Sequence, residues 1–497
     1  MSKCSIVTAC FIATLAASSA PAQLRGTVSG VVGGLRNTVT SLGNTVGSTV
    51  GGPIGGTVSN VTGAVGGTLG SVGTSVDSGL GRISGSSRTS GSGGFTLTGT
   101  RLTQPSEDEP GSSVQPISLD DVTGYLDGQL ATPNQIENMR KARLRELIRA
   151  NRDVLDRDDR GQPVRRSELI ACDPDTPSIL AAQRAGFRVV GYEPPSLLGV
   201  RIVRLALPRG VNVRQGLKAL RRAAPSLQAD YNHVYEPAGG ALLPALGASL
   251  AMRAAVRPGT RIAMIDGGVA SHPSLAAASI EQRGFVGDPQ PTGHGTAVGS
   301  LLVGSQGAFR GAARGAQLFV ADVYGGNPAA GSATAIVQAL AWAASKRPAV
   351  INISLVGPPN RTMQRAIDAV RARGIAVVAS VGNDGPAAPP QYPASYPGVI
   401  AVTGVDGADR ALIEAGQSAH LDFAAPGADL VAALPGSGYT PVRGTSFAAP
   451  FVAARLAATG STARLAAEAM PGTGKVGRGI VCRSCRILPK TVGLNFK

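Results

Sequence analysis

The chain has 497 residues, which is long enough for several domains and a large hydrophobic core. Its formal net charge of +16 favours attraction to anionic surfaces. Aromatic residues make up only 4% of the chain and no nucleic-acid-reading module is recognisable, so the charge by itself does not indicate a nucleic-acid-binding protein.

The first 22 residues have the features of an export signal. Lys3 supplies a positive end, residues 5–17 are apolar, and Ala20-Pro21-Ala22 fits a cleavage site with small residues. The apolar stretch is too short to span a bilayer, and no later run is long enough. We therefore expect an exported protein without a transmembrane segment after signal removal, located in a periplasm, on a cell surface or in the medium.

Residues 23–115 form a low-complexity region rich in Gly, Ser, Thr and Val. Apolar residues recur there from Val28 to Ile83 in steps of three and four, with a mean of about 3.67, which is the period of an eleven-residue helical repeat. Gly, Thr and Val are nevertheless poor helix formers. Two interpretations follow: a flexible spacer, or a stalk that orders only against a surface or a partner.

Residues 116–174 are charged and helix-prone, and a small domain is expected after them. The apolar face of the predicted helical segment consists of Met139, Leu144, Leu147 and Ile148. From residue 175 to residue 240 the pattern predicts strand, strand, helix and strand, at 186–192, 200–207, 213–223 and 227–235. This order is typical of a small α+β sandwich.

Residues 241–470 alternate between short apolar strands and helices. Strands are predicted at 262–265, 318–323, 350–353, 376–380 and 399–402, and helices at 295–303, 333–345 and 363–372. The pattern predicts a three-layer α/β fold with a doubly wound, mostly parallel sheet. Active groups of such a fold lie at the carboxyl ends of the strands.

Four polar residues stand at strand ends or glycine-rich turns of this domain. Asp266 follows the first buried strand, and His294, one of four histidines in the chain, lies between two glycines. Asn383 follows a later strand, and Ser446 begins an apolar helix. Each has a structural explanation when taken alone, as a turn cap, a helix cap or a left-handed turn residue. Together they supply the acid, base, amide and nucleophile needed for attack on a carbonyl.

The motifs around these residues resemble those of the subtilisin-like serine proteases (subtilases). They are D-x-G-V at Asp266, G-H-G-T around His294 and G-T-S-x-A-x-P around Ser446, in that order along the chain, and the resemblance extends from residue 263 to about residue 458. It implies that His294 is the general base, that Asp266 orients it, and that Ser446 attacks the scissile carbonyl. Asn383 and the Ser446 N–H would then hold the oxyanion.

The resemblance also implies how the substrate and the pro-region bind. The strand that pairs with the substrate backbone would consist of Ser354, Leu355, Val356 and Gly357. Residues 175–240 would be an intramolecular chaperone and inhibitor, removed by self-cleavage between about residues 235 and 261. The Tyr392–Pro393 bond is expected to be cis, as in family members.

Three departures from the family pattern affect these expectations. Gly267 stands where relatives carry a hydroxyl that helps to hold the catalytic carboxylate, so this support for the orientation of Asp266 is expected to be absent. Val356 replaces a glycine and would narrow the pocket mouth in favour of small residues. The calcium-binding loops of relatives have no acidic counterpart, so neither a metal nor another cofactor is expected.

The expected basic tail, residues 471–497, carries Cys482 and Cys485. Their C-x-x-C spacing fits a small disulfide, half of a zinc site or a redox pair, and a disulfide suits an oxidising compartment. Removal of the signal would leave Cys172 as the remaining cysteine, expected to be unpaired and buried.

Two functions from different classes remain at this stage. The first is an exported serine endopeptidase that acts on peptide or protein substrates, is made as a self-processed zymogen and binds its own propeptide. The second is a catalytically silent surface or adhesion protein that works through its low-complexity repeat. An inactive relative would be expected to lack one of the four polar residues, and all four are present.

Overall fold

The computed structural model describes residues 132–193, 197–238, 240–241, 256–257 and 259–494. The predicted signal peptide and low-complexity region, residues 1–22 and 23–115, lie outside the described residues. Among the helices that are described, none combines the length and the apolar character that crossing a bilayer requires.

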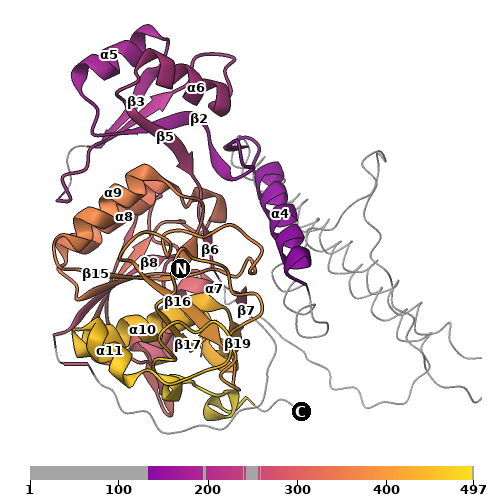
Figure 1. Ribbon diagram of the computed structural model, residues 1–497. Coiled ribbons are helices and arrows are strands. Elements are labelled where there is room, and N and C mark those ends of the chain that lie inside the picture. Colours follow the sequence, from indigo (N-terminus) through magenta and orange to yellow (C-terminus); the bar gives the residue numbers. More distant parts are fainter. Residues whose placement is uncertain (1–131, 194–196, 239, 242–255, 258, 495–497) are drawn as a thin grey trace, which may run out of the picture. The chain divides into compact units, whose positions relative to one another are not determined.

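Helix α4 (Pro133–Ala150) is the first described element, and a five-stranded antiparallel sheet follows it (Figure 1). A capping box between Thr132 and Gln135 fixes the start of α4. In the sheet β2 pairs with β1, β4 and β5, and β4 also pairs with β3. The strands and helices of this small domain are β1 (Leu155–Arg157), β2 (Pro163–Cys172), α5 (Thr176–Arg184), β3 (Arg188–Glu193), β4 (Ile202–Ala206), α6 (Val213–Ala223) and β5 (Gln228–His233).

The expectation of a helical segment over residues 116–174 is wrong for part of its length. Within the described residues 132–174, β1 and β2 follow α4 and belong to the small sheet, so the domain begins before residue 175. Residues 165–168 of β2 are polar and at least partly exposed, but Leu169 to Cys172 are buried on both faces. The strand β2 was not predicted, because its polar residues interrupt the apolar run by which a strand is recognised.

The larger domain is built on seven parallel strands in the order β17-β16-β15-β13-β8-β12-β9. The bounds are β8 (Arg261–Asp266), β9 (Ser279–Gly284), β12 (Gln317–Asp322), β13 (Val350–Ile353), β15 (Ala376–Ser380), β16 (Ile400–Val405) and β17 (Phe423–Pro426). Most of these strands are apolar throughout because both faces of a parallel sheet are covered.

Helices cover both faces of this sheet and make it the middle of three layers (Figure 1). Ile262 and Met264 of β8 pack in a cluster with the first pair of helices, α7 (Gly293–Val303) and α10 (Thr445–Thr459). Ala263 and Ile265 pack with the second pair, α8 (Ala333–Ser345) and α9 (Arg361–Arg371). The alternation along β8 follows from the two-residue period of a strand. The predicted three-layer α/β class is confirmed.

Short elements complete the larger domain. Two small sheets join β6 (Glu236–Pro237) to β14 (Leu355–Val356), and β7 (Gly240–Ala241) to β19 (Tyr439–Arg443) and β18 (Leu430–Ala433). The others are a hairpin of β10 (Ser305–Gln306) and β11 (Phe309–Arg310), helix α11 (Thr462–Glu468), and the 3₁₀ turns η1 (Pro273–Leu275), η2 (Pro328–Ala330), η3 (Arg483–Cys485) and η4 (Pro489–Val492).

Residues 471–494 are not the separate tail that composition suggested. Val481, Cys485 and Ile487 are buried in the same cluster as α7 and α10, so the larger domain continues through them. Residue 480 bridges to Ala424 in parallel fashion and extends the sheet beside β17. Arginines lie between the apolar residues of this segment, so the sequence pattern did not indicate that it is buried. Cys482 and Cys485 are joined by a disulfide, and Cys172 is a buried free thiol.

Candidate active site

Asp266 ends the strand at which the sheet reverses its order. The chain runs from β8 to β9 and β12 on one side, then crosses to β13 and onward on the other. In open α/β sheets, functional sites form at the carboxyl ends of strands at such a switch point. The Asp266 side chain is 1% exposed there, so the topology places a buried carboxyl group where chemistry is expected.

His294 is held against Asp266 by the first turn of α7. Thr292 caps the helix by accepting the Gly295 N–H, and His294 Nδ1 lies 2.8 Å from Asp266 Oδ1. A Cβ on Gly295 would be 2.3 Å from the Gly267 carbonyl oxygen, so only glycine allows this close approach. With Nδ1 donating to the carboxylate, a neutral ring has its lone pair on Nε2, and this atom has no hydrogen-bond partner among the described residues.

Ser446 is the second residue of α10, at the positive end of the helix dipole. Gly444 precedes the helix with φ of 138°, a backbone conformation that favours glycine. The centroids of the Phe447 and His294 rings lie 5.5 Å apart, so the turn that carries Ser446 adjoins the histidine. The Ser446 hydroxyl donates to the carbonyl oxygen of Ala238, and the Ser446 N–H reaches the same oxygen at 3.1 Å.

Asn383 donates to this carbonyl oxygen as well. Its Nδ2 lies 2.7 Å from the Ala238 oxygen, while its Oδ1 accepts the Thr445 N–H at 3.0 Å. The second bond fixes which end of the amide faces Ala238. Donors from two separate segments of the larger domain therefore converge on one carbonyl oxygen.

The chain on either side of Ala238 lies extended along the larger domain. Pro237 pairs with Leu355 and Glu236 with Val356, while the Ala238 N–H donates to Ser354 O at 3.2 Å. Beyond the carbonyl, β7 pairs with β19 through Gly240 and Arg443. Residues 354–356 thus pair through backbone hydrogen bonds with the segment that follows the small domain.

Tyr235 is buried next to Gly357. The Tyr235 side chain is fully buried, and its hydroxyl donates to the Pro358 carbonyl at 2.8 Å. A Cβ on Gly357 would lie 2.5 Å from the Tyr235 ring, so glycine makes room for it. The Tyr235 N–H donates to Gly331 O at 2.9 Å on the opposite flank. Gly331, Pro358 and β19 carry no mark in the sequence, because they contribute through backbone atoms.

The structure shows which side chains lie beside Gly267 and Val356, the two positions that depart from the family pattern. A Cβ on Gly267 would lie 2.3 Å from Thr292 Oγ1, so the cap of α7 occupies the space of the absent side chain. The Gly267 N–H bonds Asp266 Oδ1, whereas Oδ2 is buried without a hydrogen-bond partner among the described residues. Val356 packs against Gly382, which has φ of +87° and precedes Asn383.

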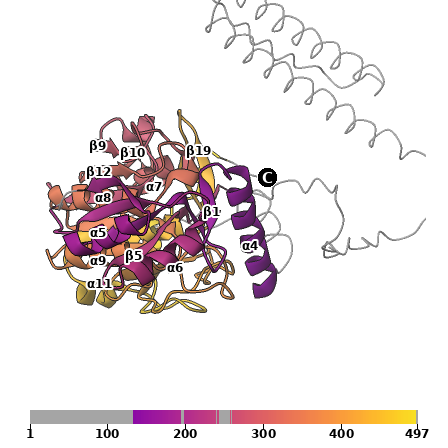
Figure 2. The ribbon, with the colours of Figure 1, turned by 90° about the horizontal axis from the view of Figure 1, so that it is seen from above.

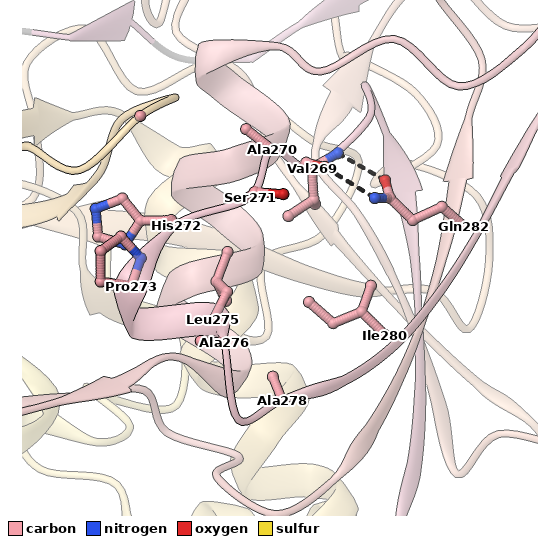
Figure 3. Close-up of a pocket in the computed structure, with 11 residues that line it drawn as sticks. Val269, Ala270, Ser271, His272, Pro273, Leu275, Ala276, Ala278, Ile280 and Gln282 are labelled. Atoms are coloured by element: carbon pink, nitrogen blue, oxygen red, sulfur yellow. Dashed lines mark hydrogen bonds between the residues drawn. The ribbon is translucent and has the colours of Figure 1, made fainter.

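A separate cavity of about 490 Å³ opens beside the segment that follows β8 (Figure 3). The Gln282 amide at its wall is fully engaged, since it bonds both the N–H and the carbonyl of Val269 at 2.8 Å. Both ring nitrogens of His272 are bonded as well, to Ser274 and Gly438. Among the described residues that line this cavity there is no carboxylate.

The Tyr392–Pro393 bond is cis. Across the described parts of the chain, no three His, Cys, Asp or Glu side chains gather as ligands for a metal ion would.

The similarity of this chain to known proteins is consistent with the observed fold. Residues 257–469 match the model of the subtilase family. Subtilisin Savinase from Lederbergia lenta is 35% identical over 202 residues, which cover 39% of this chain and 74% of the relative. Thermitase from Thermoactinomyces vulgaris is 34% identical over 204 residues, covering 39% of this chain and 72% of the relative.

A similar fold is found in fervidolysin from Fervidobacterium pennivorans, described as a keratinolytic enzyme related to subtilisin. The TM-score is 0.55 at 19% identity, over 67% of this chain and 62% of that one. At this level the likeness concerns the fold alone. With the sequence matches, it leads to one assignment: the chain belongs to the subtilase family and is a serine endopeptidase.

Proposed function

We propose that this chain is the precursor of an exported endopeptidase that works through Asp266, His294 and Ser446 and cleaves itself after Ala238. The observation that carries the proposal is the position of the Ala238 carbonyl oxygen, which accepts the Asn383 amide at 2.7 Å and the Ser446 N–H at 3.1 Å. A carbonyl held in this way is polarised toward nucleophilic attack. The bond that breaks would be Ala238–Gly239.

The chemistry follows from the charges and donors at the site. His294 Nε2 accepts the proton from the Ser446 hydroxyl, while Asp266 holds the ring in the required tautomer and stabilises the imidazolium. Ser446 Oγ bonds to the Ala238 carbonyl carbon, and Asn383 with the Ser446 N–H stabilises the negative oxygen. The imidazolium then protonates the amine of Gly239, which leaves. Water, deprotonated by His294, hydrolyses the resulting ester and frees the serine.

The small domain is proposed as the inhibitory pro-region. Its last residues pair with β14 through Glu236 and Pro237 and fill the groove that a substrate needs. Ile170 and Ile202 of its sheet pack in one cluster with α8 and α9, so the contact extends beyond the groove. A segment anchored so broadly would remain bound after the cut and block other peptides. Residues 1–22 are proposed to direct export.

The test compares full-length chains with Ser446→Ala and with Ser305→Ala, the latter an exposed serine of β10. We expect the Ser305→Ala chain to yield a product whose N-terminal sequence starts at Gly239, and the Ser446→Ala chain to stay uncut there. A fluorophosphonate should label Ser446 in the matured product. Cutting of the Ser446→Ala chain after Ala238, or absence of labelling after maturation, would favour the catalytically silent interpretation.

A further inference from the structure

Helix α4 lies outside the sheet domain that fills the groove. In Figures 1 and 2, it stands apart from α5 and α6, which cover the small sheet. It is nevertheless anchored, because Ile136, Glu137, Arg140 and Leu144 on one of its faces are buried. An eighteen-residue helix with a mostly polar sequence gains most of its stability from such packing.

One contact of α4 is the loop that carries Asn383. A Cβ on Gly385 would lie 2.7 Å from Ile136 Cγ2, so the isoleucine rests directly on the glycine backbone. Leu144 reaches the β14 side, where Val356 and Asp384 are among the residues that enclose a cavity of only about 10 Å³. The packing leaves little space between helix and enzyme. The loop beside the oxyanion donors is therefore covered by α4.

The second contact is ionic and involves both partners of the inhibited complex. Arg143 Nη2 lies 2.8 Å from Asp384 Oδ1 and 3.4 Å from Glu236 Oε2. Asp384 belongs to the enzyme and adjoins Asn383, whereas Glu236 is the third residue before the proposed cleavage site. Burial by itself would lower the pKa of Arg143, but the two carboxylates raise it above its ordinary value. The guanidinium therefore stays charged and joins the two carboxylates.

The neighbouring Arg140 does not share this role. It forms a two-pronged pair with Glu137 of the same helix, at 2.6 and 2.9 Å, and so satisfies its charge within α4. Arg143 is therefore the described arginine of α4 that pairs with carboxylates outside the helix.

We propose that α4 is a latch, a second inhibitory segment which keeps the pro-region on the enzyme after the Ala238–Gly239 bond is cut. This inference rests on the proposed self-cleavage. Cutting frees one end of the segment over residues 235–238, yet Arg143 still links Glu236 to the enzyme loop through Asp384. Release of α4 then limits the appearance of activity, whereas the cut itself does not depend on it.

The experiment follows the full-length chain after refolding, with two separate readings. N-terminal sequencing and mass spectrometry report the cut, and a fluorogenic peptide reports free activity. We expect Arg143→Ala to leave the cleavage site unchanged and to shorten the lag between cut and activity at least about tenfold, because one partner of a partly buried charge pair is lost. The matched control is Arg145→Ala, an exposed arginine on the same helix.

Two further variants distinguish loss of the ion pair from a failure of the Arg143→Ala chain to fold. Arg143→Lys keeps the charge but loses the planar fork that can contact two carboxylates, so its lag should fall between those of the parent and Arg143→Ala. Asp384→Asn should shorten the lag as well, and adding Arg143→Ala to it should shorten it by less than the product of the separate effects. Equal lags for Arg143→Ala and Arg145→Ala, or independent effects of Arg143 and Asp384, would overturn the latch. Absence of a cut after Ala238 in the parent chain would instead reject the proposed self-cleavage.

Discussion

The side-chain amide of Asn383 lies 2.7 Å from the carbonyl oxygen of Ala238. Asn383 should therefore contribute mainly to the rate of the cut rather than to the binding of the pro-region. We predict that Asn383→Asp, which keeps the shape but loses the donor, slows self-cleavage about 10² to 10³-fold. The rate is measured by gel densitometry after refolding. A slowing of less than about tenfold would show that the amide is dispensable for the oxyanion.

A second prediction concerns the space between Gly267 and Thr292. A Cβ at residue 267 would meet Thr292 Oγ1 at 2.3 Å, so Gly267→Ser should lower the free energy of unfolding by about 1–3 kcal/mol through overpacking. Thr292→Ala alone should cost about 1 kcal/mol, since it removes the cap of α7. The double variant should lose less than the sum, as measured by denaturant unfolding in the Ser446→Ala background. Additivity within about 0.5 kcal/mol would contradict the steric explanation.

The close packing of Tyr235 against Gly357 leads to a third prediction. Gly357→Ala should slow self-cleavage about tenfold or more, because the added Cβ would lie 2.5 Å from the tyrosine ring. Tyr235→Ala in the same chain should restore part of the rate by making room. The control is Tyr235→Phe, which removes only the hydroxyl bond to Pro358 O, worth about 1 kcal/mol. Failure of Tyr235→Ala to relieve Gly357→Ala would place the effect elsewhere.

The fourth prediction concerns pH and the small domain. Burial would raise the pKa of Asp158, but hydrogen bonds from His233 and the amides of Gln162 and Arg160 together hold it below its ordinary value. A carboxyl with a lowered folded-state pKa stabilises the fold above its unfolded pKa of about 3.9, and this stabilisation is lost as pH falls through the folded pKa.

Asp158→Asn should therefore reduce the free energy of unfolding at pH 7, with a difference from the parent that narrows steadily below about pH 4. Denaturant unfolding of the Ser446→Ala precursor at several pH values measures it. A difference independent of pH would mean that the charge on Asp158 is not what stabilises the domain.

Much of the larger domain could be predicted from the sequence because burial on both faces leaves an unmistakable pattern. The strands expected at 350–353 and 376–380 coincide with β13 and β15, and the helix expected at 333–345 coincides with α8. Strand β9 at the edge was missed, since its residues are mostly exposed and carry no apolar run. Whether a strand or helix can be predicted from the sequence thus depends on how deeply its residues are buried.

The candidate site was only partly predictable, for a related reason. Asp266, His294, Asn383 and Ser446 stand in recognisable local motifs, which a sequence displays directly. The Ala238 carbonyl, the Gly331 carbonyl and the pairing of Gly240 with Arg443 depend on backbone atoms brought together over long separations. Backbone groups are the same in every residue, so no side-chain pattern marks them. The two carboxylates around Arg143 are likewise joined only by folding.

The pairing of residues 479–481 beside β17 bears on how safely this chain can fold. The Ala424 N–H donates to Gly479 O at 3.0 Å, and the Val481 N–H donates to Ala424 O at 2.7 Å. β17 is the outermost strand on its side of the seven-stranded sheet, and an open edge invites pairing with other chains. In the folded chain residues 479–481 occupy that edge, so β17 is not open to pairing with another chain there.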